Sequence, residues 1–149
     1  MSKDEILGWL RETDPGRLAV LWERADDLRR RHVGDSVHLR GLIEFSNHCD
    51  RTCLYCGVRA PARGIVRYRL DAEEIVACAH QAVALGYGTV VLQSGEEDDL
   101  DVEWLAALVE RIRRETSLAI TLSVGERTEA EYARLRDAGA DRYLLRFET

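Results

Sequence analysis

Short apolar segments alternate with amphipathic segments along most of the chain. Segments with the length and composition of strands lie at 38–46, 89–93, 118–124 and 142–147. Short apolar strands that alternate with amphipathic helices predict a parallel sheet with right-handed crossover connections. We therefore expect an α/β fold in which four parallel strands form either a small open sheet or half of an eight-stranded barrel.

Helices are expected between these strands, at 71–85, 101–115 and 128–139. Asp71 and Glu74 have the spacing of a capping box at the start of the first helix. The apolar residues expected to face the sheet are Ile75, Ala79, Ala82 and Val83 in the first helix, Leu105, Leu108, Val109 and Ile112 in the second, and Tyr132 and Leu135 in the third.

Two further helices are expected before the first strand. One covers residues 3–12, and the second begins at Asp14-Pro15, because proline suits the first turn of a helix, and ends near Gly34. The apolar stripe of the second helix consists of Leu18, Leu21, Trp22, Ala25 and Leu28. We expect residues 1–36 to form a helical extension and residues 37–149 to form the α/β domain.

Composition restricts the classes of partner. The 149 residues carry a net charge of −6, and this acidic balance disfavours binding to nucleic acid. No apolar run has the roughly 20 residues that a membrane helix needs, and the first residues lack the pattern of a signal peptide. We expect a cytoplasmic protein whose cysteines bind metal or stay free rather than form disulfides.

Polar residues follow each expected strand. A loop that contains three cysteines follows the first strand, 93–96 follows the second, 123–126 follows the third, and 146–149 ends the fourth. Because the carboxyl ends of parallel strands lie at one edge of a sheet, ligands bind there in such folds. The four polar clusters therefore predict a single site.

The three cysteines Cys49, Cys53 and Cys56 have the spacing C-x3-C-x2-C. Three thiolates can bind three corners of a 4Fe–4S cube and leave the fourth iron open, whereas electron-transfer ferredoxins close it with a fourth cysteine. Cys78 lies in a helix and is expected to be a core or idle residue. Zinc is the alternative metal, but it prefers four ligands, and His48 is adjacent to Cys49, too close in sequence to reach the same ion easily.

The cysteine loop, with Tyr55 directly before its last cysteine, resembles that of the radical SAM superfamily. Within that superfamily the sequence is similar to the HydE family of FeFe-hydrogenase maturases. The similar stretches are 41–47, 54–57, 91–96, 121–126 and 138–146. The resemblance implies a TIM-type barrel of which this chain holds four strands, truncated after the fourth.

The resemblance also implies a 4Fe–4S cluster held by Cys49, Cys53 and Cys56 that binds S-adenosylmethionine (SAM) and generates a 5′-deoxyadenosyl radical. The residues that it assigns to SAM are Tyr55, Ser94, Gly95, Glu96 and Glu148. Those that it assigns to a small-molecule substrate are Gln93, Thr121, Arg142 and Arg146. Glu126 and Glu96 can also simply be solvated loop acids. An electron donor such as a ferredoxin or flavodoxin is implied as a partner.

Other functions stay open at this point. A biotin synthase-like or methylornithine synthase-like enzyme shares the cysteine loop, and a non-catalytic module that binds zinc or an iron–sulfur cluster is the alternative from another class. Half a barrel has an unpaired edge and an exposed inner face. We therefore expect an oligomer or a missing C-terminal half, and no activity from these 149 residues alone.

Overall fold

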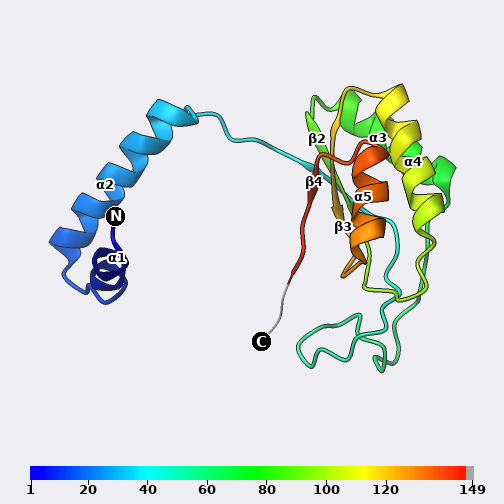
Figure 1. The fold of residues 1–149 in the computed structure, drawn as a ribbon, viewed down its shortest axis with the longest axis horizontal. Helices are drawn as coiled ribbons and strands as arrows, with labels where there is room; N and C mark the ends of the chain where they lie inside the picture. The colour runs from blue at the N-terminus through cyan, green and yellow to red at the C-terminus, as the bar shows by residue number, and fades with distance from the viewer. Residues whose placement is uncertain (147–149) are drawn as a thin grey trace. The chain divides into compact units, whose positions relative to one another are not determined.

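The computed structural model describes residues 1–146 (Figure 1). They divide into two compact units, Met1–His38 and a second that starts at Leu39. None of the helices in the described part of the chain is long and apolar enough to cross a membrane.

The first unit contains helices α1 (Lys3–Leu10) and α2 (Pro15–His32). Ser2 caps α1 in a capping box with Glu5, and Asp14 caps α2 ahead of Pro15. Helix α1 ends two residues earlier than expected. Neither helix buries a residue, and Trp22, expected in an apolar stripe, is 63% exposed.

The second unit is built on four parallel strands in the order β1-β2-β3-β4 (Figure 1). The strands are β1 (Gly41–Glu44), β2 (Thr89–Gln93), β3 (Ala119–Ser123) and β4 (Arg142–Tyr143). Helices α3 (Ala72–Ala84), α4 (Val102–Glu115) and α5 (Glu129–Asp137) connect them. The expected α/β fold with four parallel strands and crossover helices is confirmed.

Polar side chains fix where the connecting helices begin. Asp71 and Thr128 form capping boxes with the glutamates three residues later in α3 and α5, and Asp101 accepts a hydrogen bond from the Trp104 amide at the start of α4. Each cap binds an amide that has no partner within the first turn. The helices therefore start within one residue of the expected positions.

The core lies between the sheet and these three helices. Its strand residues are Ile43, Val90, Leu92, Ile120 and Leu122, and its helix residues include Ile75, Ala79, Leu105, Val109, Ile112 and Leu135. The stripe expected on α3 is wrong at one position. Val83 is 41% exposed, whereas Val76 is buried, because the buried face of α3 includes the position beside Ile75.

The opposite face of the sheet is open in this unit. Register places Leu42, Val91, Thr121 and Arg142 in one row across the four strands. The next row contains Glu44, Gln93 and Ser123. Leu42 at the edge of the first row is 56% exposed. Two rows of side chains that do not face the helices thus point to the side that the expected barrel would enclose.

Three strands are shorter than expected, and β3 lacks one residue at each end of the expected range 118–124. Residues 38–40 form no strand, because β1 pairs only with Val90–Gln93 on one side and has no second neighbour among the described residues. Within residues 144–146 one further sheet hydrogen bond follows β4, from the Leu144 amide to the Leu122 carbonyl at 2.8 Å. The remainder of the expected strand 142–147 reaches Phe147, which lies outside the described residues.

Candidate functional site

A cavity of about 390 Å³ lies at the carboxyl ends of the strands. All three cysteines of the expected C-x3-C-x2-C site line it, together with Tyr55. The strand-end residues that line it are Glu44, Gln93, Ser94, Gly95, Glu96, Ser123, Gly125, Leu144 and Arg146. The polar clusters that follow the four strands thus meet at one site.

Cys49, Cys53 and Cys56 are free thiols, each partly buried. A turn brings the last two together, with the Cys56 amide donating to the Cys53 carbonyl at 3.0 Å. No group of three or more His, Cys, Asp or Glu side chains within residues 1–146 is gathered closely enough to hold a metal ion. The cysteines therefore share a cavity wall without converging on one point. Three soft thiol donors without a fourth on the same wall suit an iron–sulfur cube with one open corner better than tetrahedral zinc.

The two ends of the cysteine-bearing loop are held by Arg67. Its guanidinium donates to the carbonyl of Asn47, two residues before Cys49, and to the carbonyl of Val58, two residues after Cys56, the latter at 2.7 Å. A third hydrogen bond reaches the Arg59 carbonyl at 2.8 Å. Charged donors make stronger hydrogen bonds than neutral ones, so this side chain fixes the span of the loop independently of any metal.

The loop also touches the segment that follows β2. A Cβ atom on Gly95 would lie 1.9 Å from the His48 carbonyl oxygen and 2.7 Å from Cys49 Cβ. The Asp50 amide donates to the Glu96 carbonyl at 2.8 Å, and the Gly95 amide donates to the Ser46 carbonyl at 3.3 Å. Gly95 thus permits a backbone approach that any larger residue would prevent.

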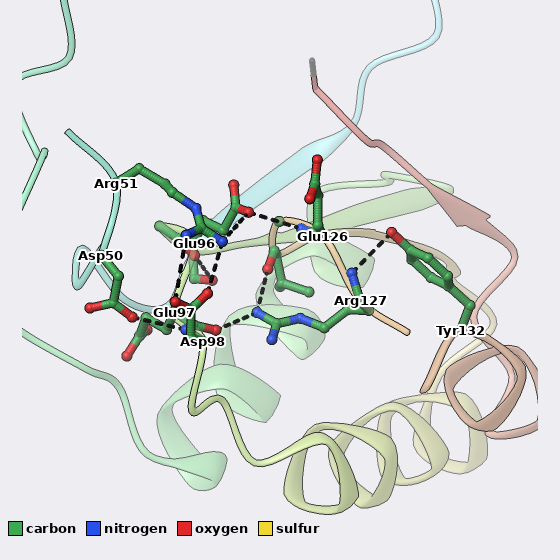
Figure 2. A network of polar contacts seen from close by, with 12 residues as sticks. Asp50, Arg51, Glu96, Glu97, Asp98, Glu126, Arg127 and Tyr132 are labelled. Carbon is green, nitrogen blue, oxygen red and sulfur yellow. Dashed lines mark hydrogen bonds and ion pairs between the residues drawn. The ribbon is translucent and has the colours of Figure 1, made fainter. Parts of the chain in front are cut away.

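Figure 2 shows that the contact continues in the side chains. Arg51 Nη2 lies 2.9 Å from Glu96 Oε1 and 2.8 Å from Asp98 Oδ1. The hydrogen bond to Glu96, and then the charges of both carboxylates, raise the pKa of Arg51 above its ordinary value. The Glu126 amide donates to the same Oε1 of Glu96 at 3.3 Å. Glu126 therefore contributes its backbone to this network, and its own side chain is exposed.

Behind this network lie Glu97 and Arg127. Glu97 is 4% exposed, accepts a hydrogen bond from Ser46 Oγ at 3.0 Å and forms an ion pair with Arg69. Arg127 Nη2 donates to the Glu97 carbonyl at 2.7 Å and to the Val124 carbonyl at 2.8 Å (Figure 2). These two side chains tie the segment after β2 to the start of the cysteine-bearing loop and to the end of β3.

The loop after β3 is fixed by Gly125 and Tyr143. Gly125 has a φ of 84°, and a Cβ there would lie 2.2 Å from Glu96 Cγ. Tyr143 on β4 donates its hydroxyl to the Gly125 carbonyl at 2.7 Å, and its ring packs edge-on against Tyr132. Burial raises the pKa of Tyr143, so its hydroxyl remains a donor at physiological pH.

The expected substrate residues divide into two groups. Arg146 Nη2 donates to Gln93 Oε1 at 2.9 Å, and Gln93 Nε2 donates to Glu44 Oε1 at 3.1 Å, so these three side chains form a chain along the cavity wall. Thr121 is buried and pairs in register with the exposed Arg142. Neither of these two lines the cavity; they lie one row deeper on the open face of the sheet.

The remaining residues considered for the site lie outside the cavity wall or outside the described residues. Cys78 is exposed on α3, so a core role for it is wrong. His48 is half-buried beside Cys49. Glu148, expected to bind SAM, lies outside the described residues. Sequence reasoning missed Arg51, which lies inside the cysteine motif, and Arg67, which lies eleven residues after Cys56.

The chain is similar in sequence to known proteins. Residues 43–149 match the radical SAM superfamily. The chain is 46% identical over 136 residues to the FeFe-hydrogenase maturase subunit HydE of Thermotoga maritima, which covers 91% of this chain and 39% of that protein. It is 32% identical over 146 residues to biotin synthase of Pelobacter propionicus, which covers 94% of this chain and 44% of that protein.

Solved structures agree. Methylornithine synthase (PylB) superposes with a TM-score of 0.83 at 27% identity, over 97% of this chain and 43% of that one. The FeFe-hydrogenase maturase HydG superposes with a TM-score of 0.81 over 91% of this chain and 31% of that one, and at 20% identity it supports the fold alone. The chain spans about two fifths of the length of the curated relatives named above. Because the family match covers the strands and the cysteine motif together, this chain belongs to the radical SAM superfamily.

Proposed function

We propose that this chain forms the cluster-binding and SAM-binding part of a HydE-like enzyme that acts in FeFe-hydrogenase maturation. The observation that carries the proposal is the shared cavity of Cys49, Cys53, Cys56 and the Ser94–Glu96 segment. The 46% identity to a HydE subunit supports the choice within the superfamily. The activity proposed is that of the whole enzyme.

The three cysteines are proposed to hold a 4Fe–4S cluster and to leave one iron for SAM. Their partial burial suits this role, because a cluster ligand needs both access for loading and protection from oxidants. When bound, the cluster and SAM would supply the radical chemistry that begins with hydrogen abstraction from a substrate. The chain's own contribution is to fix the cysteine-bearing loop through Arg67 and to hold it against Gly95.

For SAM, we propose contacts from Ser94, Gly95, Glu96 and the region of Tyr55. An ammonium group prefers carboxylate and carbonyl acceptors, and the Glu96 side chain is only 25% exposed on the cavity wall. Partial burial strengthens such a charge pair relative to water. Glu148 remains a prediction from the resemblance.

For the substrate, we propose a small carboxylate-containing molecule bound by Arg146 and Gln93, with Thr121 and Arg142 deeper in the barrel. A guanidinium can bind a carboxylate through two parallel hydrogen bonds, which fixes orientation as well as position. The Gln93–Arg146 contact at 2.9 Å positions the guanidinium before substrate arrives. A reduced ferredoxin or flavodoxin is proposed as electron donor.

A second candidate is an enzyme resembling biotin synthase or methylornithine synthase. The TM-score of 0.83 with PylB favours it. The HydE-like proposal is preferred because identity falls from 46% for HydE to 32% for biotin synthase over matches of similar length. A non-catalytic module that binds zinc or an iron–sulfur cluster remains the candidate from a different class.

Anaerobic reconstitution of the full-length protein with iron and sulfide tests the proposal. We expect about four irons per chain, a change in the EPR spectrum of the reduced cluster when SAM is added, and formation of 5′-deoxyadenosine from SAM. Cys56→Ser is the matched variant that should lose these signals, and Cys78→Ser should keep them. A protein that binds one zinc and no iron, or a cluster whose spectrum ignores SAM, would contradict the proposal.

The finer assignment needs a cellular assay. The full-length gene should restore hydrogenase activity in a bacterium that lacks its HydE, and it should fail to restore growth without biotin in a strain that lacks biotin synthase. The reverse pattern would support the second candidate.

A further inference from the structure

Arg51 links the first half of the cysteine motif to the segment after β2. It lies between Cys49 and Cys53 in the sequence, and its guanidinium contacts Glu96 and Asp98 (Figure 2). Backbone amides join the same two segments. The Asp50 amide binds the Glu96 carbonyl at 2.8 Å, and the Asp98 amide binds Asp50 Oδ2 at 2.9 Å. The two segments are therefore joined along their length.

The contacts on Glu96 are unevenly distributed between its two carboxylate oxygens. Arg51 Nη2 and the Glu126 amide both donate to Oε1. Gly125 packs against the Cγ of Glu96, with room for no side chain of its own. An ionised carboxylate has about four acceptor positions over two oxygens. Among the described residues Oε2 receives no hydrogen bond, so it remains an acceptor while Oε1 and the methylene group are fixed.

We infer that Arg51 is a positioning residue: it holds Oε1 of Glu96 so that Oε2 receives the amino group of SAM. This inference rests on the proposed function. Asp98 serves as the anchor that holds the guanidinium in place. Because Arg51 belongs to the cysteine motif itself, the arrangement also makes the SAM-binding carboxylate depend on the position of the cluster-binding loop.

Direct binding of SAM by Arg51 is the competing explanation, since Arg51 also lines the cavity. Its Nη2 already donates to two carboxylates at 2.8–2.9 Å, and Nη1 reaches the second oxygen of Asp98 at 3.5 Å. Two adjacent carboxylates offset its positive charge, which leaves little attraction for the carboxylate of SAM. The two explanations differ in what they predict for Asp98.

The test measures the dissociation constant of SAM on the anaerobically reconstituted full-length protein, by titration of the EPR signal of the reduced cluster. The variants are Arg51→Gln, Arg51→Lys, Asp98→Asn and Glu96→Gln. Arg63→Gln is the control, because Arg63 is an exposed arginine of the same loop that makes no hydrogen bond or ion pair within the described part of the chain. Iron per chain is measured for each.

For Arg51→Gln we expect normal iron content and a dissociation constant raised about five- to tenfold, in the range of a partly exposed charged hydrogen bond. Arg51→Lys should recover part of the loss, since an ammonium can bind one of the two carboxylates. Asp98→Asn should weaken SAM binding more mildly. In the Arg51→Gln/Glu96→Gln double variant, the loss should equal that of Glu96→Gln alone, because both changes remove one interaction.

Amide hydrogen exchange on the protein without cluster gives a second readout. Exchange of the Asp50 amide should accelerate in Arg51→Gln and stay unchanged in Arg63→Gln. This measurement needs neither cluster nor SAM, so it tests the loop contact even where reconstitution of a variant is poor.

The opposing outcomes are distinct. Wild-type affinity in Arg51→Gln, or tighter SAM binding in Asp98→Asn, would overturn the inference and leave the proposed function standing. If the increase in the SAM dissociation constant in the double variant equalled the product of the increases in the two single variants, Arg51 would act independently of Glu96. That result would also overturn the inference. A wild-type protein that binds a cluster but no SAM would sink the proposed function and this inference with it.

Discussion

Replacing Gly95 with alanine places a methyl group against the backbone of the cysteine-bearing loop. The added carbon would lie 1.9 Å from the His48 carbonyl oxygen and 2.7 Å from Cys49 Cβ. Contacts of Cβ atoms below 3.0 Å are essentially never seen, so the two segments must separate by at least 1.1 Å, the difference between 3.0 and 1.9 Å. The obstructing atom belongs to the backbone, so a change of rotamer cannot relieve the clash.

The cost of such overpacking is about 1–3 kcal/mol, which lowers the melting temperature by about 4–12 °C for a unit of this size. The displacement also moves Cys49 and weakens the hydrogen bonds of Gly95 and Asp50. We therefore expect Gly95→Ala to hold less than half of the wild-type iron after reconstitution. Iron and sulfide analysis and thermal unfolding by circular dichroism measure the two effects.

Gly88→Ala is the matched control, because a Cβ at Gly88 meets no atom within 4 Å. It should keep the full iron content and melt within about 2 °C of the wild type. If Gly95→Ala also retained both its iron and its melting temperature, the close packing of the two segments would be refuted.

Three further predictions concern the cysteines, the core and the acid response. Serine at Cys56 should abolish the cluster, whereas serine at the exposed Cys78 should leave the iron content unchanged, as measured by iron analysis. Alanine at Phe45, which is fully buried with its ring centre 6.0 Å from that of Trp104, should cost about 3–5 kcal/mol in urea-induced unfolding. The backbone amide and hydroxyl of the residue that caps α5 lower the pKa of Glu131, so its stabilisation is present above the pKa of the unfolded chain and is lost as pH falls through the folded pKa. Glu131→Gln should therefore reduce the loss of melting temperature between neutral pH and about pH 3, and an unchanged pH profile would contradict this.

Much of the fold could be predicted from local sequence signals. Capping residues such as Asp71 and Thr128 fixed the helix starts because their side chains act on amides within the same turn. The apolar run 89–93 matched β2 because a central parallel strand is buried on the helix side and paired along both edges. Such signals need no knowledge of distant residues.

The strand ends were harder to predict because they depend on pairing partners. Residues 38–40 have strand-like composition, but the pairing with β2 begins only at Gly41, opposite Val90, so β1 begins there. Val83 follows the helical apolar pattern, yet it is exposed because α3 presents the face around Ile75 and Val76 to the sheet. Tertiary packing decides between adjacent apolar positions on one helix.

The candidate site shows the same division. The C-x3-C-x2-C spacing predicted that Cys49, Cys53 and Cys56 share one loop. Because ligands bind at the carboxyl ends of parallel strands, the sequence also predicted that Glu96 lies at the same edge of the sheet. The role of Arg51 could not be foreseen, because its partners lie 45 and 47 residues away. An arginine inside a cysteine motif does not by itself indicate which distant carboxylates it contacts.

The central claim is that one iron of the cluster stays free of protein ligands and is available to SAM. Electron–nuclear double resonance on the reduced cluster, with SAM labelled by ¹⁵N at its amino group, tests this claim most directly. We predict a hyperfine coupling between the label and the cluster in the wild type, lost in Cys56→Ser together with the cluster. A stable cluster that showed no coupling at saturating SAM would contradict the account.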